Sequence, residues 1–332
     1  MSPVVSALEA AWYSGAWWLW LLRPVEFLFR SVAAVRKAAY QRGILKAWRA
    51  PVPVVVIGNI TVGGTGKTPI VVALVEHLQA HGLRPGVVSR GYGATAKAFP
   101  HTVNASSTAA DCGDEALLIH RRTGCPCVVS PDRPAAVRQL LNDFAVDVVL
   151  SDDGLQHYAL ARDLEIAVVD AKRGLGNGFC LPAGPLREPA SRLAEVHHVL
   201  QRGSDSLRDG VCYQARALIN IASDQQREVG PDGGTQVVSA VAGIGQPGQF
   251  FDTLLAAGYT VQEYVFADHH AYTPDDFSTL QDQVIIMTEK DAVKCKGLVG
   301  DNAWYLKISA QLPRTVTDAV AALAQQQNQE AP

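Results

Sequence analysis

The sequence predicts an α/β protein with a mostly parallel sheet that is flanked by helices. Three observations predict this class: an apolar strand that runs into a glycine-rich loop at residues 54–68, an alternation of strand and helix patterns after it, and a composition that can form a large core. Alternating strands and helices favour parallel pairing, because each crossover helix carries the chain back across the sheet. A second, smaller α/β lobe and an N-terminal membrane-associated helix complete the predicted architecture.

The composition limits the classes of protein that the chain can belong to. Its 332 residues are 48% hydrophobic and 18% charged, enough to bury a large core and long enough for about two domains. The formal net charge of -3 gives no general sign of nucleic-acid binding, so no nucleic-acid partner is expected. Six cysteines without a C-x-x-C pair or zinc spacing predict buried thiols in a reducing compartment.

Residues 10–22 carry no charge and contain four of the six tryptophans. The next stretch, residues 23–49, holds seven Lys or Arg side chains against the single acid Glu26. As a helix, residues 10–22 would extend roughly 20 Å, which is short of the ~30 Å hydrocarbon core. The pattern favours a helix that lies in or dips into an anionic membrane surface, with the basic side cytoplasmic. A helix packed on the protein's own core is the alternative.

Residues 54–68, with the sequence VVVIGNITVGGTGKT, join a buried strand to a loop that ends in Gly-Lys-Thr. Glycines allow the backbone N–H groups of such a loop to surround phosphate oxygens, and the positive end of the following helix adds attraction. We expect the loop residues to hold a nucleotide triphosphate, namely Gly63, Gly64, Thr65, Gly66, Lys67 and Thr68. Lys67 would reach the β- and γ-phosphates, and the Thr68 hydroxyl would bind Mg²⁺.

The loop departs at one position from the pattern G-x-x-x-x-G-K-[ST]. That pattern has a glycine five residues before Gly66, where this chain has Thr61. A plain glycine-rich turn is the alternative interpretation. Strand, loop and amphipathic helix nevertheless follow one another in the required order, so the sequence predicts a P-loop NTPase-type fold.

After the loop, strand patterns alternate with helical patterns. Strands are expected at residues 86–89, 127–130, 146–150 and 164–169, and helices at 114–122 and 135–144. The polar stretch 203–235 predicts an irregular linker. Strands at 236–242, 259–266 and 284–288 and helices at 249–257, 274–280 and 315–326 follow, and the tail 325–330 is expected to fray. The predicted division is an N-terminal helical segment 1–50, a P-loop domain 51–202, the linker 203–235 and a C-terminal α/β lobe 236–332.

Two carboxylates, Asp152 and Asp153, follow the strand at residues 146–150. Ligands bind at the carboxyl edge of open α/β sheets, and carboxylates there would complement Thr68 around Mg²⁺. Arg90 ends the strand at 86–89 and could neutralise phosphate charge. A surface turn is the alternative for the two acids.

The pattern leaves the roles of three other sites open. Asp114 opens a helix, where it could serve as an N-cap. Asp268 and His269 follow a strand and could form an acid/base or metal pair as easily as a surface loop. The glycines of residues 243–248 fit a dinucleotide-binding fingerprint, but a turn that leads into a helix explains them without a ligand.

Seven motifs occur in order along nearly the whole chain. They are residues 58–68, Ser89-Arg90-Gly91-Tyr92-Gly93, Gly113-Asp114-Glu115, Asp152-Asp153-Gly154-Leu155-Gln156-His157, Gly184-Pro185-Leu186-Arg187-Glu188, Asp268-His269, and Thr288-Glu289-Lys290-Asp291-Ala292-Val293-Lys294. With these motifs the chain closely resembles the tetraacyldisaccharide 4'-kinases, also called lipid A 4'-kinases. Thr61 matches the family's own form of the loop.

The resemblance implies transfer of the ATP γ-phosphate to the 4'-hydroxyl of an acylated glucosamine disaccharide 1-phosphate, which forms lipid IVA in lipid A biosynthesis. It implies ATP and Mg²⁺ as cofactors. The implied partners are this acceptor and the inner-membrane phospholipid surface. The implied location is the cytoplasmic face of the bacterial inner membrane, with peripheral or single-helix attachment.

The resemblance also implies roles for individual residues. Asp114 would act as the base toward the sugar hydroxyl, assisted by His269. The residues that would serve ATP and Mg²⁺ are Lys67, Thr68, Asp152, Asp153, Glu115 and Glu188, with Thr68, Glu115, Asp153 and Glu188 nearest the metal. An Asp–His pair split between two lobes would form only when the lobes close, which would limit wasteful ATP hydrolysis.

Two other classes of function remain open. A P-loop NTPase switch should hydrolyse nucleotide without an acceptor, although the chain lacks a guanine-binding Asn-Lys-x-Asp sequence and has only the partly similar residues 288–291. An assembly factor at the membrane would use ATP structurally and transfer nothing.

Overall fold

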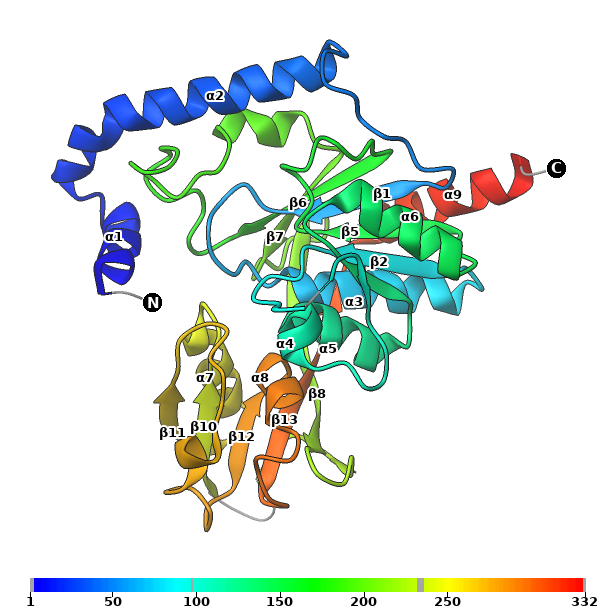
Figure 1. Cartoon of the computed structure of the whole chain (residues 1–332). Coiled ribbons are helices and arrows are strands. Elements are labelled where there is room, and N and C mark those ends of the chain that lie inside the picture. Colours follow the sequence, from blue (N-terminus) through cyan, green and yellow to red (C-terminus); the bar gives the residue numbers. More distant parts are fainter. Residues whose placement is uncertain (1–2, 97, 232–235, 331–332) are drawn as a thin grey trace.

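The structure is a computed structural model that describes residues 3–96, 98–231 and 236–330. It confirms the predicted α/β class, with a mostly parallel sheet flanked by helices. Two lobes and an N-terminal helical segment can be distinguished (Figure 1).

The sheet of the P-loop lobe is mostly parallel. From one side to the other its strands are β7 (His198–Arg202), β6 (Leu164–Asp170), β1 (Val54–Gly58), β5 (Val148–Asp152), β2 (Pro85–Ser89), β4 (Cys127–Val129) and the short antiparallel β3 (His101–Thr102). Every residue of β1, β2 and β5 is buried, which explains their continuous apolar runs. In the ladder between β1 and β5, Ile57 is opposite Asp152. The glycine-rich loop and the two aspartates therefore both lie at the carboxyl edge of the sheet.

Helices cover both faces of this sheet. The helices α3 (Lys67–Ala80), α5 (Asp114–Thr123) and α9 (Arg314–Glu330) share a buried core with one face, whereas α6 (Arg133–Asp143) packs on the other. Two short elements, α4 (Ala109–Cys112) and the 3-10 helix η2 (Ala190–Ala194), complete this lobe. Five of the six free thiols are buried as predicted, and Cys212 is half-buried.

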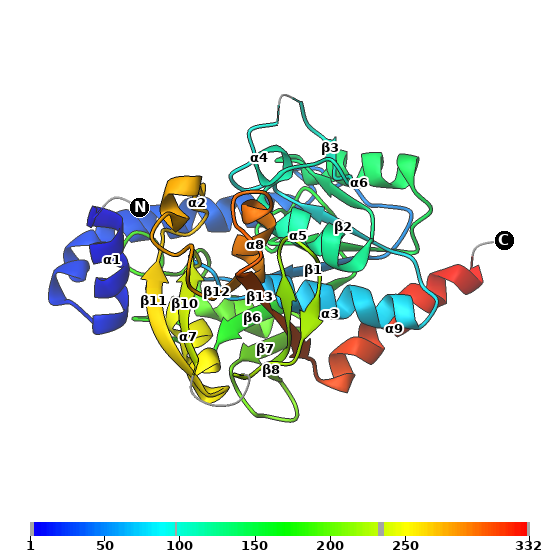
Figure 2. The ribbon, with the colours of Figure 1, turned by 90° about the horizontal axis from the view of Figure 1, so that it is seen from below.

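The last helix differs from its prediction in two respects. Its residues Val316, Val320 and Ala324 lie in the core of the P-loop lobe, so α9 does not pack with the lobe that precedes it in the chain. Figure 2 shows α9 extending beside α3. The helix also continues to Glu330, where the polar composition predicts fraying.

The C-terminal lobe has its own parallel strands, β11 (Tyr259–Val265), β10 (Gln236–Ala242), β12 (Ile285–Thr288) and β13 (Ala303–Gln311), in this order across the sheet. The helices α7 (Pro247–Ala256) and α8 (Glu289–Cys295) belong to this lobe. Phe250 and Phe251 of α7 pack on the strands. Where a helix is predicted at 274–280, the chain forms only the 3-10 turn η3 (Pro274–Phe277).

The composition of the segment 203–235 predicts an irregular linker, and this prediction is wrong. It contains the eleven-residue strand β8 (Gly210–Asn220) and the short β9 (Gln226–Arg227), which pair with each other, while residues 232–235 lie outside the described part. The first residues of β8 pair with β7 and its later residues pair antiparallel with β13. One strand thus belongs to both lobes, and the full order is β11-β10-β12-β13-β8-β7-β6-β1-β5-β2-β4-β3.

The N-terminal segment is broken, not one continuous helix over residues 10–22. The helix α1 (Pro3–Ser14) ends before Gly15, whose φ of 69° suits glycine, and the 3-10 helix η1 (Trp17–Leu22) leads into α2 (Arg23–Gln41). Trp12 is buried, whereas Trp17 is 76% exposed. The segment therefore packs one side on the protein and presents tryptophan on the other. Among the described residues, none of the helices combines the length and apolar character that crossing a membrane requires.

Candidate nucleotide and phosphoryl-transfer site

The glycine-rich loop connects β1 to α3, as the sequence predicts. Gly63 and Gly66 have φ values of 95° and 72°, a region that residues with a Cβ rarely adopt. Gly66 is the N-cap of α3, so the unpaired N–H groups of the first helical turn lie at the loop. A Cβ built on Gly63 or Gly64 would meet no atom within 4 Å. The loop is therefore open at Gly63, while Tyr213 donates to the Gly66 carbonyl. A glycine-rich loop at a helix N-terminus is the local structure that binds phosphate.

The Thr61 departure has a structural reason. The Val62 N–H donates to the Pro185 carbonyl at 2.8 Å, and the Arg187 N–H donates to the Ile60 carbonyl at 2.6 Å. Residues 60–62 are thus extended and paired with residues 185–187, a conformation that needs no glycine. The same pairing brings Arg187 to the loop.

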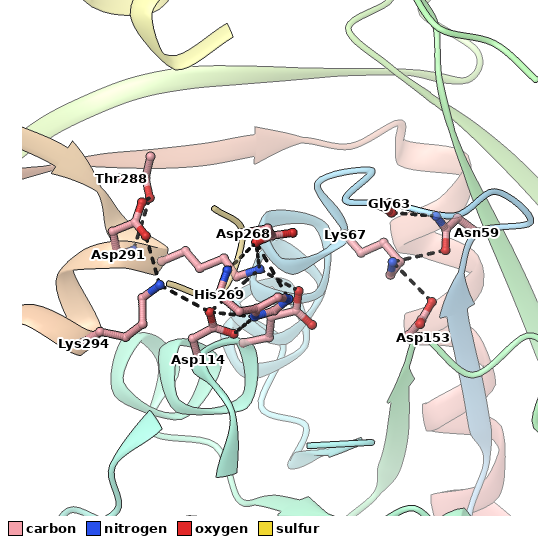
Figure 3. Close-up of polar contacts among 12 residues, drawn as sticks. Asn59, Gly63, Lys67, Asp114, Asp153, Asp268, His269, Thr288, Asp291 and Lys294 are labelled. Carbon is pink, nitrogen blue, oxygen red and sulfur yellow. Dashed lines mark hydrogen bonds and ion pairs between the residues drawn. The ribbon is translucent and has the colours of Figure 1, made fainter. Parts of the chain in front are cut away.

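The Lys67 ammonium lies between two side chains of its own lobe (Figure 3). Its Nζ is 3.2 Å from Asp153 Oδ1 and 3.2 Å from Asn59 Oδ1. Arg187 Nη1 pairs with the other oxygen of Asp153 at 3.0 Å. Burial opposes ionisation of Asp153, but Lys67 and Arg187 outweigh it and lower the pKa of this carboxyl. Asp153 is therefore an anion that neutralises Lys67.

A cavity of about 360 Å³ lies beside the loop and is walled by both lobes. The P-loop lobe contributes Gly64 to Thr68 and Glu115, while α7, α8, β8 and β13 form the other side. The apolar lining includes Val72, Leu118, Ala215, Phe250, Leu306 and Ile308. Apolar walls next to a phosphate-binding loop suit a nucleoside triphosphate. The turn at residues 243–248 lines this same cavity through Ile244, Gly245 and Gln246, which supports a role beside the loop and not a separate dinucleotide site.

Asp152 is buried with neither carboxylate oxygen accepting a hydrogen bond from the described residues. Burial, reinforced by the negative charge of Glu115, raises the pKa of Asp152 to about 7. Arg133 donates to the Asp152 backbone carbonyl at 2.7 Å and fixes the strand end. Burying a carboxylate without hydrogen-bond donors is costly, and a bound cation would compensate its charge. Thr68 and Glu115 line the cavity, and the charge of Glu115 acts on Asp152.

This donor set fits Mg²⁺. No three His, Cys, Asp or Glu side chains in the described part of the chain are grouped closely enough to hold a metal ion alone. Mg²⁺ in phosphoryl-transfer sites is usually held by one or two carboxylates together with substrate phosphates. Thr68, Asp152 and Glu115 therefore suit it only when a triphosphate supplies the remaining oxygens.

Two predicted ligands, Glu188 and Arg90, are not among the residues that line this cavity. Glu188 is buried, and its carboxylate accepts hydrogen bonds from Gln156, at 2.9 Å, and from Tyr158. Each Glu188 oxygen thus accepts one hydrogen bond, and Glu188 does not line the cavity that the described residues form. Arg90 is exposed at the end of β2 and does not line the cavity that the described residues form.

Asp114 and His269 come from different lobes and meet beside the cavity. Asp114, the first residue of α5, is 4% exposed, and its Oδ2 lies 3.0 Å from His269 Nδ1. Burial opposes ionisation of Asp114, but the His269 hydrogen bond and two lysine charges outweigh it and lower its pKa. Burial likewise opposes the charged form of His269, but its bond to Asp114 raises the histidine pKa. The predicted split pair is thus formed in this structure.

Sequence reasoning missed the lysines that surround this pair. On α8, Lys290 Nζ lies 3.2 Å from Glu115 Oε1 and 3.2 Å from Asp268 Oδ1, and Lys294 Nζ lies 3.7 Å from Asp114 Oδ2. Asp291 is fully buried, where it accepts from the Gly243 N–H at 2.9 Å and pairs with Lys294 at 3.1 Å. These residues belong to the motif at 288–294, and their helical spacing was the available signal.

A second connection between the lobes was also missed. Arg122 of α5 donates to both oxygens of Glu289, at 2.9 and 2.8 Å, and to the Ile308 carbonyl at 3.1 Å. Its Nε also pairs with Glu76 of α3 at 3.2 Å. Arg122 thus joins two helices of the P-loop lobe to α8 and β13.

Comparison with known proteins assigns the chain to a family. A model of the family described as Tetraacyldisaccharide-1-P 4'-kinase matches residues 18–326. The chain is similar to the tetraacyldisaccharide 4'-kinase of Pseudomonas fluorescens, at 51% identity over 306 residues and 91% of each chain. It is also similar to that of Aeromonas salmonicida, at 47% identity over 320 residues, 94% of this chain and 95% of that one.

Among solved structures, LpxK from Aquifex aeolicus in complex with ATP superposes with a TM-score of 0.77 at 27% identity. The alignment covers 93% of this chain and 99% of that chain. Both lobes, the glycine-rich loop and the Asp114–His269 pair lie within the span of the family match. The chain therefore belongs to the tetraacyldisaccharide-1-phosphate 4'-kinase family.

Proposed function

We propose that this chain transfers the γ-phosphate of ATP to the 4'-hydroxyl of a tetraacylated glucosamine disaccharide 1-phosphate, forming lipid IVA in lipid A biosynthesis. As a member of its family, the chain is an ATP-dependent phosphotransferase with an alcohol acceptor. The observation that carries the residue assignments is the meeting of Asp114 and His269 beside the glycine-rich loop. A phosphate site with a base at its side is what transfer to a hydroxyl requires.

The loop residues 63–68 bind the triphosphate in this proposal. Their backbone N–H groups and the N-terminus of α3 supply partial positive charge that is already in place before the nucleotide binds. Lys67 exchanges its contact with Asp153 for the β- and γ-phosphate oxygens. Arg187 remains with Asp153, which keeps that acid neutralised when Lys67 moves.

Asp114 accepts the proton of the sugar hydroxyl as its oxygen attacks the γ-phosphorus. His269 donates from Nδ1 to the carboxylate and orients it. The lowered pKa makes Asp114 a weak base. A weak base suffices, because the transition state of phosphoryl transfer is loose and depends on positioning and charge neutralisation. Closure of the lobes is needed to assemble the pair, so productive transfer requires both lobes.

Thr68, Asp152 and Glu115 are the residues that we assign to Mg²⁺. A bound Mg²⁺ supplies charge neutralisation at the phosphate oxygens. The unpaired buried oxygens of Asp152 support its assignment ahead of Asp153, which is paired with Lys67 and Arg187. Lys290 holds Glu115 from the other lobe and links its orientation to closure.

The N-terminal segment binds the membrane peripherally in this proposal, on the cytoplasmic face of the inner membrane. Trp17, Trp20 and Phe27 are 76%, 64% and 72% exposed. Exposed tryptophan next to basic residues suits the interface of an anionic leaflet. An acceptor with four acyl chains stays in that leaflet, so the enzyme must approach it there.

One assay tests the function. The protein is incubated with γ-labelled ATP and Mg²⁺, with and without the acylated disaccharide 1-phosphate in mixed micelles. Labelled lipid that appears only with the acceptor is expected. Release of labelled phosphate without the acceptor would instead favour an NTPase switch, and no consumption of ATP would favour a scaffold.

The buried Asp291 weighs against a guanine switch, because its side chain is occupied by Gly243 and Thr288.

A further inference from the structure

Asn59 is a fully buried polar residue directly after β1. Its Oδ1 accepts a hydrogen bond from Lys67 Nζ at 3.2 Å (Figure 3). Its Nδ2 donates to the Gly63 carbonyl at 3.3 Å and to Thr61 Oγ1 at 3.4 Å. One amide thus connects the start of the loop, its first glycine turn and its lysine.

The backbone of Asn59 is held as firmly as its side chain. Its carbonyl accepts from Gln156 Nε2 at 3.2 Å, and Gln156 also donates to Glu188 at 2.9 Å. Residues 60–62 are paired with residues 185–187. The Asn59 side chain is therefore anchored by its own backbone contacts. Gly63 and Gly64, in contrast, have no atom within 4 Å where a Cβ would point.

We propose that Asn59 is a positioning residue, which sets the Gly63 turn and holds Lys67 beside the loop before the triphosphate arrives. This inference rests on the proposed function, in which the loop and Lys67 bind the phosphates. Glycine-rich loops have many accessible conformations, so fixing the Gly63 carbonyl reduces the entropy lost on binding. Holding Lys67 near its bound position reduces that loss further, because a free lysine has many rotamers.

The chemistry of an amide explains why asparagine suits this position. It accepts from the ammonium and donates to a carbonyl at the same time, and it carries no charge. Aspartate would have the same shape but could not donate to the Gly63 carbonyl when ionised. It would also place a second anion at Lys67 in addition to Asp153, and so retain the lysine against the phosphates.

A double-mutant cycle on nucleotide affinity tests the inference. Affinity for a non-hydrolysable ATP analogue with Mg²⁺ is measured by calorimetry for Asn59→Ala, Lys67→Ala and the double variant of the full chain. Loss of a hydrogen bond to a charged group predicts that Asn59→Ala weakens affinity about 10-fold in the native background. In the Lys67→Ala background the same change should cost clearly less than about 10-fold, because the lysine contact is already lost and only the bonds to Gly63 and Thr61 remain.

Two further variants keep the test decisive. Asn59→Asp preserves the shape of the residue and should still lower affinity about 10-fold, mostly through the retained lysine. If Asn59→Ala fails to fold, as judged by its melting curve, Asn59→Asp replaces it in the cycle. Asn142→Ala, at an exposed position of α6 where one side-chain hydrogen bond is lost, should leave affinity unchanged.

The outcomes separate this inference from the kinase assignment. Equal losses in the native and Lys67→Ala backgrounds would overturn the positioning of Lys67 by Asn59. Native affinity in Asn59→Asp would overturn the positioning role as a whole. The binding cycle needs no acceptor, so failure to label lipid with a strongly coupled cycle would refute only the lipid kinase. Labelled lipid with an additive cycle would refute only the positioning of Lys67 by Asn59.

Discussion

His269 Nδ1 lies 3.0 Å from Asp114 Oδ2, and this contact joins the loop after β11 to the first turn of α5. Both residues belong to short motifs, but 155 positions separate them in the chain. The contact depends on the arrangement of the two lobes, which β8 connects. In our proposal, the alignment of the base Asp114 by His269 therefore depends on both lobes.

Replacement of Asp114 by alanine should lower kcat by about 10²- to 10⁴-fold, the usual effect of losing a general acid or base. The affinity for ATP should change little, because Asp114 contacts the acceptor side of the reaction in our proposal. Steady-state kinetics with micellar acceptor and calorimetry with an ATP analogue check the two quantities. Asp143→Ala, at an exposed position of α6, is the matched control and should retain full turnover. Unchanged turnover in Asp114→Ala would refute the base assignment.

Asp152→Asn should stabilise the nucleotide-free protein at pH 8 while it lowers activity. The pKa of Asp152 is raised from 3.8 to about 7 by burial and by Glu115. A raised carboxyl pKa means that the folded state binds the proton more tightly than the unfolded state. Stability is therefore lost as the pH rises from about 4 to about 7, and the cost stays constant above that range. Asparagine has no charge to bury and avoids this cost.

Melting temperatures at pH 5 and pH 8, without nucleotide, check the Asp152 prediction. The gain of Asp152→Asn over the native chain should be larger at pH 8 than at pH 5. A variant that is less stable than the native chain at both values would show that Asp152 has donors in solution. Reduced Mg²⁺-dependent activity of the same variant would support its assignment as a ligand.

Replacing Arg122 by glutamine should lower the free energy of unfolding by about 3 kcal/mol, because it leaves the largely buried Glu289 carboxylate without its partner. The side chains of Arg122 and Glu289 are 8% and 13% exposed. Urea unfolding of Arg122→Gln, Glu289→Gln and the double variant should give a coupling energy that a surface pair lacks. The Lys296–Asp224 pair is 59% and 73% exposed, so Lys296→Gln should change stability by less than about 0.5 kcal/mol. Additive effects of the Arg122 and Glu289 changes would show that the pair does not hold the lobes together.

The double change Trp17→Ser and Trp20→Ser should weaken binding to anionic phospholipid vesicles and lower activity on membrane-embedded acceptor. Both side chains are mostly exposed, so the fold should be retained. Deleting residues 1–22 is a harsher test, because Trp12 and Leu19 are buried against the protein. Vesicle sedimentation measures binding, and Leu207→Ser, at a 99% exposed apolar residue elsewhere, is the control. Equal sedimentation of the double variant and the native chain would contradict a tryptophan anchor.

The sequence by itself determined the class of fold, the position of the nucleotide loop and the family. These features are local, because an apolar strand, a glycine turn and a helix start are each set by residues that are neighbours in the chain. The Asp114 and His269 motifs could also be found in this way. The prediction of a linker missed β8 because polar residues surround it, although Val211, Tyr213, Ala215, Ala217 and Ile219 alternate as in a strand. Its pairing with both β7 and β13 is decided only by the tertiary structure.

Only the tertiary structure determined which acidic side chains are paired with donors and which are buried without them. Asp152 and Asp153 are adjacent in sequence, yet one is buried without a donor and the other is bound by Lys67 and Arg187. Glu188 is occupied by Gln156 and Tyr158, and α9 packs in the first lobe and not the second. These outcomes depend on contacts between residues far apart in the chain, and the charge or packing that each side chain meets exists only after the lobes have folded together.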